Sequence, residues 1–230
     1  DPDYNSRRVA TLIVAVQCAR SAATCFCASM STGPHADTGF DLALTELEPE
    51  GDHRFLLQVG SAEGAALADG LPLRDATGDD LAAARRTESH AAAIQTRRLP
   101  ADIAPRLKGR ENHPGWKVVA DKCLHCANCT LACPTCFCSD VEDTNDLTGE
   151  HTERWRVWDS CFSVDFSYIH GGAVRQDPAA RYRQWLTHKL STWHDQFGTS
   201  GCVGCGRCIA WCPVGIDITE EAIAIAHDDG

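Results

Sequence analysis

Two short segments of the chain each carry four cysteines at the same spacing. Residues 123–134 and residues 202–213 both fit C-x2-C-x2-C-x3-C-P without a gap. Three thiolates placed two residues apart can wrap one loop around a face of a metal cluster, whereas the fourth begins a segment that points elsewhere. In ferredoxins with two such motifs, the fourth cysteine ligates the cluster of the other motif. The spacing therefore predicts two 4Fe-4S clusters with exchanged fourth ligands.

This exchange assigns every cysteine of the two motifs. The first cluster is expected to take Cys123, Cys126, Cys129 and Cys212, and the second Cys202, Cys205, Cys208 and Cys133. Pro134 and Pro213 follow the fourth cysteines and remove an amide donor there. Gly204 and Gly206 let the backbone of the second loop approach inorganic sulfide closely.

Zinc is the main alternative metal, because C-x2-C pairs also build four-cysteine zinc sites. A zinc ribbon needs two pairs, whereas each motif here adds a third C-x2-C step and a terminal Cys-Pro. The pattern favours iron and sulfide. Metal analysis that found zinc and no acid-labile sulfide would instead indicate a zinc-stabilised interaction module without a redox role.

Six cysteines lie outside the two motifs. Three of them follow a strand-like run and lie in a loop rich in Gly, Ser and Thr: Cys18, Cys25 and Cys27. They could hold three corners of a third 4Fe-4S cluster, with a fourth ligand from upstream or from between the motifs, or they could be buried thiols. The other three are expected to be buried free thiols, because none has a complete ligand set of its own: Cys136, Cys138 and Cys161.

The elements around these cysteines predict an α+β fold. Apolar or alternating runs at residues 9–18, 40–47 and 54–59 are typical of strands, and residues 61–98 predict a short helix followed by a longer one. Residues 100–115 are rich in Pro and Gly and suit a linker. We expect a mixed α/β domain at residues 1–111, incomplete at its N-terminus, and a ferredoxin-like two-cluster domain at residues 112–230.

The two motifs are separated by an insert of 68 residues, 134–201, so the ferredoxin-like module is split. Residues 155–158 predict a strand, and residues 178–197 predict a helix that begins at Pro178 and ends at Gly198. Arg181 and Arg183 are expected on the solvated face of that helix.

The net charge, the lack of long apolar runs and the motifs that are missing limit the functions that the chain could have. The formal net charge of −11 disfavours nucleic-acid partners. The sequence has no run long enough to span a bilayer and no signal-peptide core, so the 14 cysteines predict a reducing, cytoplasmic setting. It contains no G-x-G-x-x-G or Walker motif and no recognisable nucleophile or flavin motif, which predicts a non-catalytic chain. The start at Asp1, without Met, suggests that an N-terminal portion is missing.

The chain resembles the beta subunit of cytoplasmic hydrogenase/sulfur reductase (sulfhydrogenase) complexes and the related electron-transfer subunit of anaerobic sulfite reductase. Five segments carry this resemblance and extend it over almost the whole chain: residues 24–27, 133–138, 146–150, 158–162 and 201–216. They are more specific than the ferredoxin motif alone. Family members also extend further upstream than Asp1.

The resemblance implies an electron-transfer subunit of an oxidoreductase complex. Its partners would be the large and small subunits of a nickel–iron hydrogenase and a flavin subunit that handles NAD(P)H. In the sulfite reductase, siroheme subunits replace the hydrogenase half. Nickel that purifies with the chain would favour the first assembly, and siroheme absorption the second.

Overall fold

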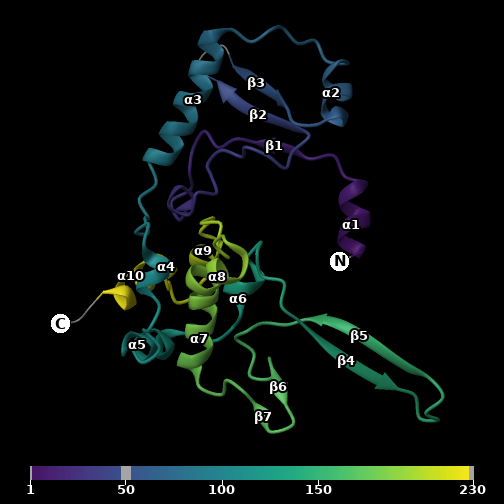
Figure 1. The fold of residues 1–230 in the computed structure, drawn as a ribbon, viewed down its shortest axis with the longest axis vertical. Coiled ribbons are helices and arrows are strands. Elements are labelled where there is room, and N and C mark those ends of the chain that lie inside the picture. Colours follow the sequence, from purple (N-terminus) through teal and green to yellow (C-terminus); the bar gives the residue numbers. More distant parts are fainter. Residues whose placement is uncertain (1, 48–52, 228–230) are drawn as a thin grey trace. The chain divides into compact units, whose positions relative to one another are not determined.

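The computed structural model describes residues 2–47 and 53–227 (Figure 1). The chain forms two compact units that divide after residue 96, upstream of the boundary expected near residue 112. Residues 97–111 group with the second unit because they bond to it. Arg97 forms an ion pair with Asp217, and the Ser191 hydroxyl donates to the Ala104 carbonyl oxygen at 2.7 Å.

The first unit contains a three-stranded sheet with the order β1-β2-β3. Strand β1 (Val14–Val16) pairs in parallel with β2 (Leu42–Leu47), which pairs antiparallel with β3 (Arg54–Val59). Helix α2 (Ala62–Ala68) follows the sheet, and α3 (Gly78–Ala93) packs on β2 and β3. Leu47 and Leu56 pack with Ala83 and Ala84 in this core. The short helix and the longer helix both agree with the sequence prediction.

The predicted first strand is shorter than expected. Residues 9–18 were expected to be extended, but only Val14–Val16 pairs, and helix α1 (Pro2–Val9) precedes it. Asp3 in the first turn and Arg7 and Arg8 in the last turn of α1 complement the helix dipole. No residue of α1 is buried, so these charges favour the helix without support from a core.

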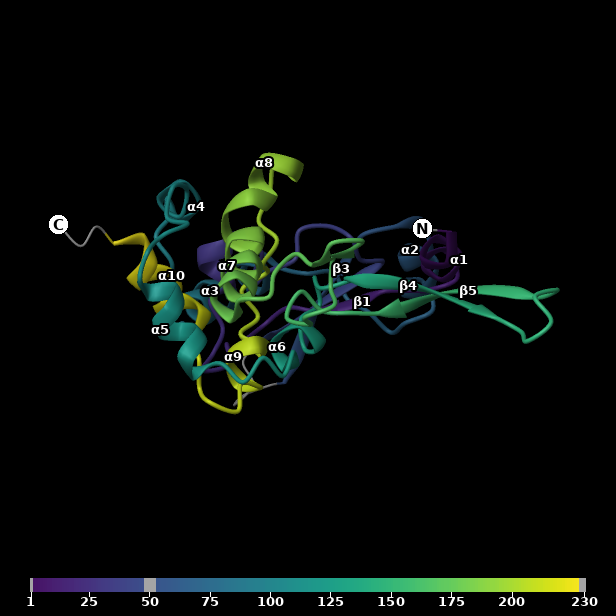
Figure 2. The same ribbon diagram turned by 90° about the horizontal axis from the view of Figure 1, so that it is seen from below.

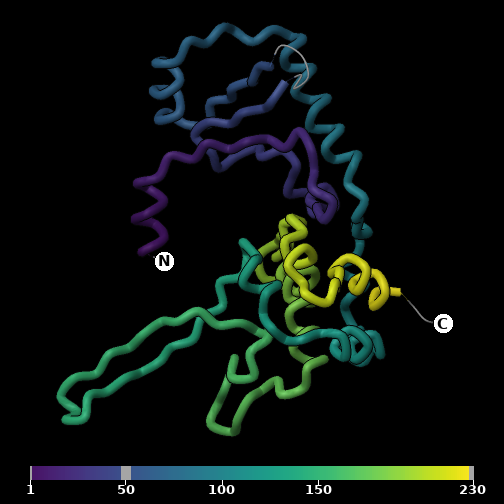
Figure 3. The backbone as a smooth tube through the Cα atoms, turned by 180° about the vertical axis from the view of Figure 1, so that it is seen from behind, coloured from purple at the N-terminus to yellow at the C-terminus, as the bar shows by residue number. Residues whose placement is uncertain are grey.

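The second unit is built from short helices connected by loops. Its helices are α4 (Ile103–Arg106), α5 (Gly115–Lys122), α6 (Asn128–Leu131), α7 (Pro178–Thr187), α8 (Trp193–Phe197), α9 (Arg207–Ala210) and α10 (Ile218–Ala226). Helices α5 and α7 pack together, and α6 packs against α9, as the tube in Figure 3 also shows. Buried Trp116, Trp185, Leu186 and Ile225 contribute to its core.

The predicted helix at residues 178–197 forms, with a change of winding in its middle. Between α7 and α8, residues His188–Thr192 form a π-helical turn, η2. Asp177 caps α7 by accepting from the amides of Ala179 and Ala180, with Pro178 in the first turn. Gly198, at φ 71°, ends α8. Turns of π-helix occur often at functional sites, because they alter which backbone groups are free to bond elsewhere.

The insert also contains strands that the sequence only partly predicted. Strands β4 (Ser139–Asn145) and β5 (Thr152–Trp158) form an antiparallel hairpin, and β6 (Tyr168–Ile169) pairs with β7 (Gly172–Ala173). The β4–β5 hairpin projects away from the helices of its unit (Figures 1 and 2). Arg154 and Asp143 join its strands through contacts of 2.6 and 2.8 Å.

Within the described residues, none of the helices combines the length and the apolar character that crossing a membrane would require.

Candidate metal centre

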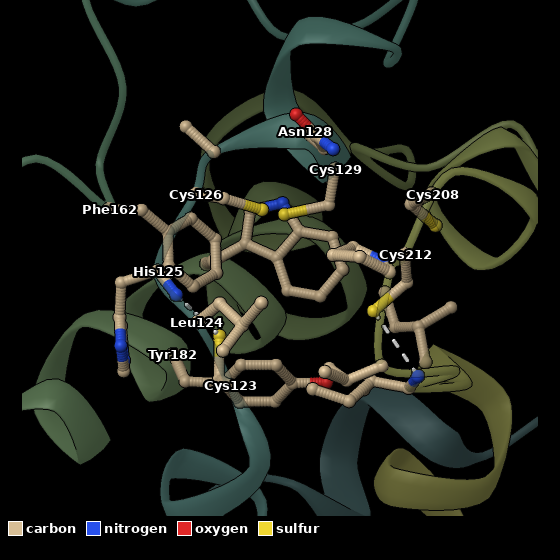
Figure 4. Close-up of a pocket in the computed structure, with 16 residues that line it drawn as sticks. Cys123, Leu124, His125, Cys126, Asn128, Cys129, Phe162, Tyr182, Cys208 and Cys212 are labelled. Atoms are coloured by element: carbon tan, nitrogen blue, oxygen red, sulfur yellow. Dashed lines mark hydrogen bonds between the residues drawn. The ribbon is translucent and has the colours of Figure 1, made fainter.

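One pocket of the second unit collects cysteines from both motifs (Figure 4). Cys123, Cys126 and Cys129 line it from the first loop, and Cys212 lines it from the end of the second. Cys208 lies on its edge with them. The pocket therefore brings together all four cysteines that were expected to share the first cluster, although Cys212 lies more than 80 residues downstream of Cys129.

The two motif loops have the same backbone shape. His125 and Gly204 occupy equivalent positions, with φ values of 52° and 64°. Ala127 and Gly206 are also equivalent, with φ values of 62° and 68°, and each precedes a short helix, α6 or α9. Glycine adopts this left-handed conformation at little cost, whereas His and Ala do not. The first loop therefore holds its shape against backbone strain.

Backbone amides point at cysteine sulfur in both loops. The amide of His125 donates to Cys123 Sγ at 3.4 Å, and the amide of Gly204 donates to Cys202 Sγ at 3.3 Å. A third amide, of Ile216, donates to Cys212 Sγ at 3.2 Å. Hydrogen bonds of this kind stabilise a thiolate and tune a cluster that the thiolate ligates.

The second group of cysteines surrounds Cys133. The charges of Cys133 and Cys205 act on Cys202, and those of Cys202 and Cys133 act on Cys208. The charge of Cys129, from the first loop, also acts on Cys208. The two groups of sulfurs are therefore neighbours, and they approach each other at helices α6 and α9.

Burial controls the protonation of these thiols. It raises the pKa of Cys129 to about 12 and the pKa of Cys202 to about 11, and it also raises the pKa of Cys208. Such thiols keep their protons at neutral pH when no metal is bound. Because metals bind the thiolate, filling the site must release protons.

Aromatic side chains from the insert form one wall of the pocket. Phe162, Tyr182 and Trp185 pack together with ring centroids 5.5–6.1 Å apart. The Tyr182 hydroxyl and Trp185 Nε1 are buried, and neither has a hydrogen-bond partner among the described residues. His125 Nε2 is likewise buried and has no hydrogen-bond partner among the described residues. Buried donors beside a pocket of thiols suit a group that carries acceptor sulfur atoms, as a 4Fe-4S cluster does.

Two buried cations lie near the sulfurs, and neither was predicted from the sequence. Arg181 was predicted on a solvated helix face, which is wrong, because it is 6% exposed and donates to the carbonyl oxygens of Arg175 and Gln176. Its charge acts on Cys123. Lys189, in η2, is also 6% exposed, and its charge acts on Cys133 and Cys136. No spacing rule could have identified either residue, because their burial depends on tertiary packing.

The three thiols of the first unit also lie close together. The charges of Cys27 and Cys25 act on Cys18. Phe26, between two of these cysteines, is fully buried and anchors the loop. Buried Gln95 donates to Cys27 Sγ at 3.1 Å and accepts from the Ala28 amide at the same distance. Phe26 and Gln95 thus hold the loop at Cys27, whereas Cys18 is exposed.

The three thiols of the insert are arranged in pairs. The side chain of Cys136 hydrogen-bonds to Cys133, which lowers the pKa of Cys133. The side chain of Cys161 hydrogen-bonds to Cys138 and lowers the pKa of Cys138 to about 6. These cysteines are half-buried. The expectation that they are buried free thiols remains a prediction.

Across residues 2–47 and 53–227, no three Cys, His, Asp or Glu side chains converge on a point where a single metal ion would sit. The candidate centre is therefore defined by the repeated loop and the shared pocket.

Comparison with known proteins agrees with this geometry. Residues 122–216 match the family model of the 4Fe-4S dicluster domain. Over 221 residues, the chain is 34% identical to the Sulfhydrogenase 2 subunit beta of Pyrococcus furiosus. The chain resembles a sulfhydrogenase beta subunit. The match includes 94% of this chain and 64% of the relative, so the chain spans a little under two thirds of that protein's length.

The resemblance expected from the cysteine segments is therefore confirmed, and a 4Fe-4S dicluster domain lies in the second unit. No solved structure matches the chain.

The strained first loop leads to a prediction about stability. Replacing Ala127 by Gly should stabilise the metal-free chain by about 1 kcal/mol, because Gly adopts a positive φ without the Cβ clash. Ala132→Gly is the matched control. Ala132 has φ −78°, so Gly there should lower stability by about 0.5–1 kcal/mol. Denaturant unfolding under anaerobic, metal-free conditions measures both changes, and equal changes in the two variants would contradict the strain argument.

Proposed function

We propose that this chain is an electron-transfer subunit that carries two 4Fe-4S clusters. Cys123, Cys126, Cys129 and Cys212 would hold the first cluster, and Cys202, Cys205, Cys208 and Cys133 the second. Each cluster would take up and release one electron. The residues of this chain hold the iron through thiolates, direct amides at the sulfurs and limit access of water.

The position of Cys212 beside the cysteines of the first loop is the observation that best supports this proposal. Cys212 lines the pocket of the first loop, and Cys133 acts electrostatically on Cys202 and Cys208. Independent zinc sites would not require cysteines to be exchanged between loops. The match of residues 122–216 to a 4Fe-4S dicluster domain supports the presence of iron–sulfur clusters in this unit.

The proposed route for electrons runs through the contact between α6 and α9. Cys129 lies in α6 and Cys208 lies in α9, and the charge of one acts on the other. A pair of clusters ligated at these positions would be adjacent, so an electron could pass between them without a mobile carrier. The chain would then transfer electrons directly from one cluster to the other.

The exchange can be tested with Cys133→Ala. If the proposal is correct, this variant loses the iron and sulfide of one four-iron cluster and retains the EPR signal of the cluster at Cys123, Cys126 and Cys129. Cys138→Ala is the matched control, because it removes an insert thiol that pairs with Cys161 rather than with a proposed ligand, and it should leave both clusters intact. Loss of only the first-loop cluster in Cys133→Ala would disprove the exchange.

We also propose a third cluster in the first unit, held in part by Cys18, Cys25 and Cys27. The proximity of Cys18 to Cys25 and Cys27, whose charges act on it, supports this proposal, as does the donor Gln95 at Cys27. Packing alone does not require three cysteines in one loop beside a side-chain amide, whereas a metal cluster would.

Replacing Cys25 by Ala tests this third cluster. Iron content should fall by the amount in one four-iron cluster, and the signals of the two clusters in the second unit should remain. Thr24→Ala is the control, because it changes the neighbouring side chain in the same loop and removes no thiol. Iron content and EPR spectra that match the unmodified chain would remove the third cluster from the proposal.

The proposed partners follow from the similar protein. That relative is a sulfhydrogenase subunit, so we propose that this chain relays electrons between a flavin subunit that uses NAD(P)H and the catalytic subunits of a nickel–iron hydrogenase. The name of the relative favours this assembly over the anaerobic sulfite reductase.

The chain isolated from its native source should therefore purify with nickel in amounts comparable to the chain itself. Metal analysis of the anaerobically purified complex measures this, and optical spectra recorded on the same sample detect siroheme. A complex with siroheme and no nickel would replace the hydrogenase by the sulfite reductase, and it would leave the cluster assignments unchanged.

A further inference from the structure

Lys189 is a buried cation in direct contact with the candidate second cluster site. Its Nζ donates to the Thr135 hydroxyl at 3.1 Å and to the Gly201 carbonyl oxygen at 3.3 Å. Lys189 is 6% exposed, and the charges of Cys133 and Cys136 act on it. Its ammonium group is thus held between the end of the first motif and the start of the second.

The surrounding structure fixes this side chain in place. The Lys189 carbonyl oxygen accepts from the Gly201 amide at 2.9 Å and from the Ser200 hydroxyl at 3.2 Å. A Cβ atom at Gly201 would lie 3.2 Å from the Lys189 Cα and 3.1 Å from the Trp193 ring, so only Gly fits comfortably there. The π-helical turn η2 thus clamps the segment that enters the second motif at Cys202.

Thr135 connects the lysine to the other side of the site. Its hydroxyl donates to the Gly201 carbonyl oxygen at 2.8 Å and lies 3.2 Å from Cys133 Sγ. Lys189, Thr135 and Gly201 therefore link the end of the first motif to the start of the second. The positive charge of Lys189 is therefore part of this link, and it lies beside Cys133 at the end of the first motif.

The first cluster site also has a buried cation, but that side chain is bonded to carbonyl oxygens of its own segment and not to the segments that carry the motifs. Its nearest buried cation, Arg181, acts on Cys123 through its charge, but its Nη1 donates to the carbonyl oxygens of Arg175 and Gln176. The charge of Lys189 interacts with His188 and with four cysteines of the second site and the insert. These cysteines are Cys133, Cys136, Cys138 and Cys202. The two sites therefore differ in electrostatic environment although their loops have the same shape.

We propose that Lys189 is a positioning residue that raises the reduction potential of the second cluster above that of the first, so that electrons in the pair collect on the second cluster. This inference rests on the proposed function, because it requires both clusters. Reduction adds negative charge to a cluster, and an adjacent ammonium stabilises that charge. Burial keeps water from screening the interaction.

The test is a redox titration of the full chain, loaded with clusters anaerobically and followed by EPR. In Lys189→Met, the ratio of reduced to oxidised second cluster at a fixed ambient potential should fall about tenfold, a shift of about 59 mV for a one-electron couple. The first cluster should keep its potential. Lys189→Arg should restore most of the difference because it retains the charge. Lys117→Met is the matched control, because it removes the same charge from an exposed position.

The outcomes separate this inference from the proposed function. A chain that binds no iron and no sulfide would disprove the proposed function itself. Two clusters with an unchanged second potential in Lys189→Met, or a shift no larger than in Lys117→Met, would overturn the role of Lys189 alone.

If Lys189→Met does not assemble its clusters, the unmodified chain provides a second measurement. Lysine labelled with nitrogen-15 at Nζ should give a hyperfine coupling to the cluster that is reduced first. A first-reduced cluster without that coupling would overturn the inference.

Discussion

The crowding of ionisable sulfur in a buried space is the constraint on which the second unit depends. Cys208 illustrates it: burial raises its pKa, and the charges of Cys202, Cys129 and Cys133 raise it further. Without metal, the buried thiols must keep their protons, and with metal they become thiolates whose charge needs compensation. In the proposed clusters, iron would supply most of that compensation. The buried cations Arg181 and Lys189 and three backbone amides lie at these sulfurs and would supply the rest.

The features that sequence predicts well are those fixed by local geometry. Each motif specifies a loop and a short helix within twelve residues, and both loops form as the spacing predicts, with Cys129 and Cys208 on equivalent helices. The two-cluster domain is supported by comparison with known proteins. Pro178 and Gly198 also mark the ends of a real helical segment, because a first-turn proline and a terminal glycine act within one turn of the backbone.

Features that depend on tertiary packing were not predictable in the same way. Arg181 has the sequence context of a surface arginine, and it is buried because α7 turns that face toward Phe162 and the first loop. The β4–β5 hairpin gave only a weak signal at residues 155–158. Nearly all its residues are exposed, so no apolar face imposes a period of two on the sequence. The left-handed conformation of His125 and Ala127 could not be predicted from the sequence either, because Gly occupies the equivalent positions only in the second loop.

The insert between the motifs explains why two loops of the same shape need not behave alike. A repeat with a short connection would surround both clusters with similar groups, because the loops differ little in backbone. The insert places Phe162, Tyr182, Trp185 and Arg181 at the first site and Lys189 at the second. The two cations differ in how they are held: Arg181 Nη1 donates to carbonyl oxygens of its own segment, whereas Lys189 Nζ donates to Thr135 and Gly201, which link the two motifs. In the proposed pair of clusters, this difference, supplied by the 68 inserted residues, would place the electron preferentially on the second cluster.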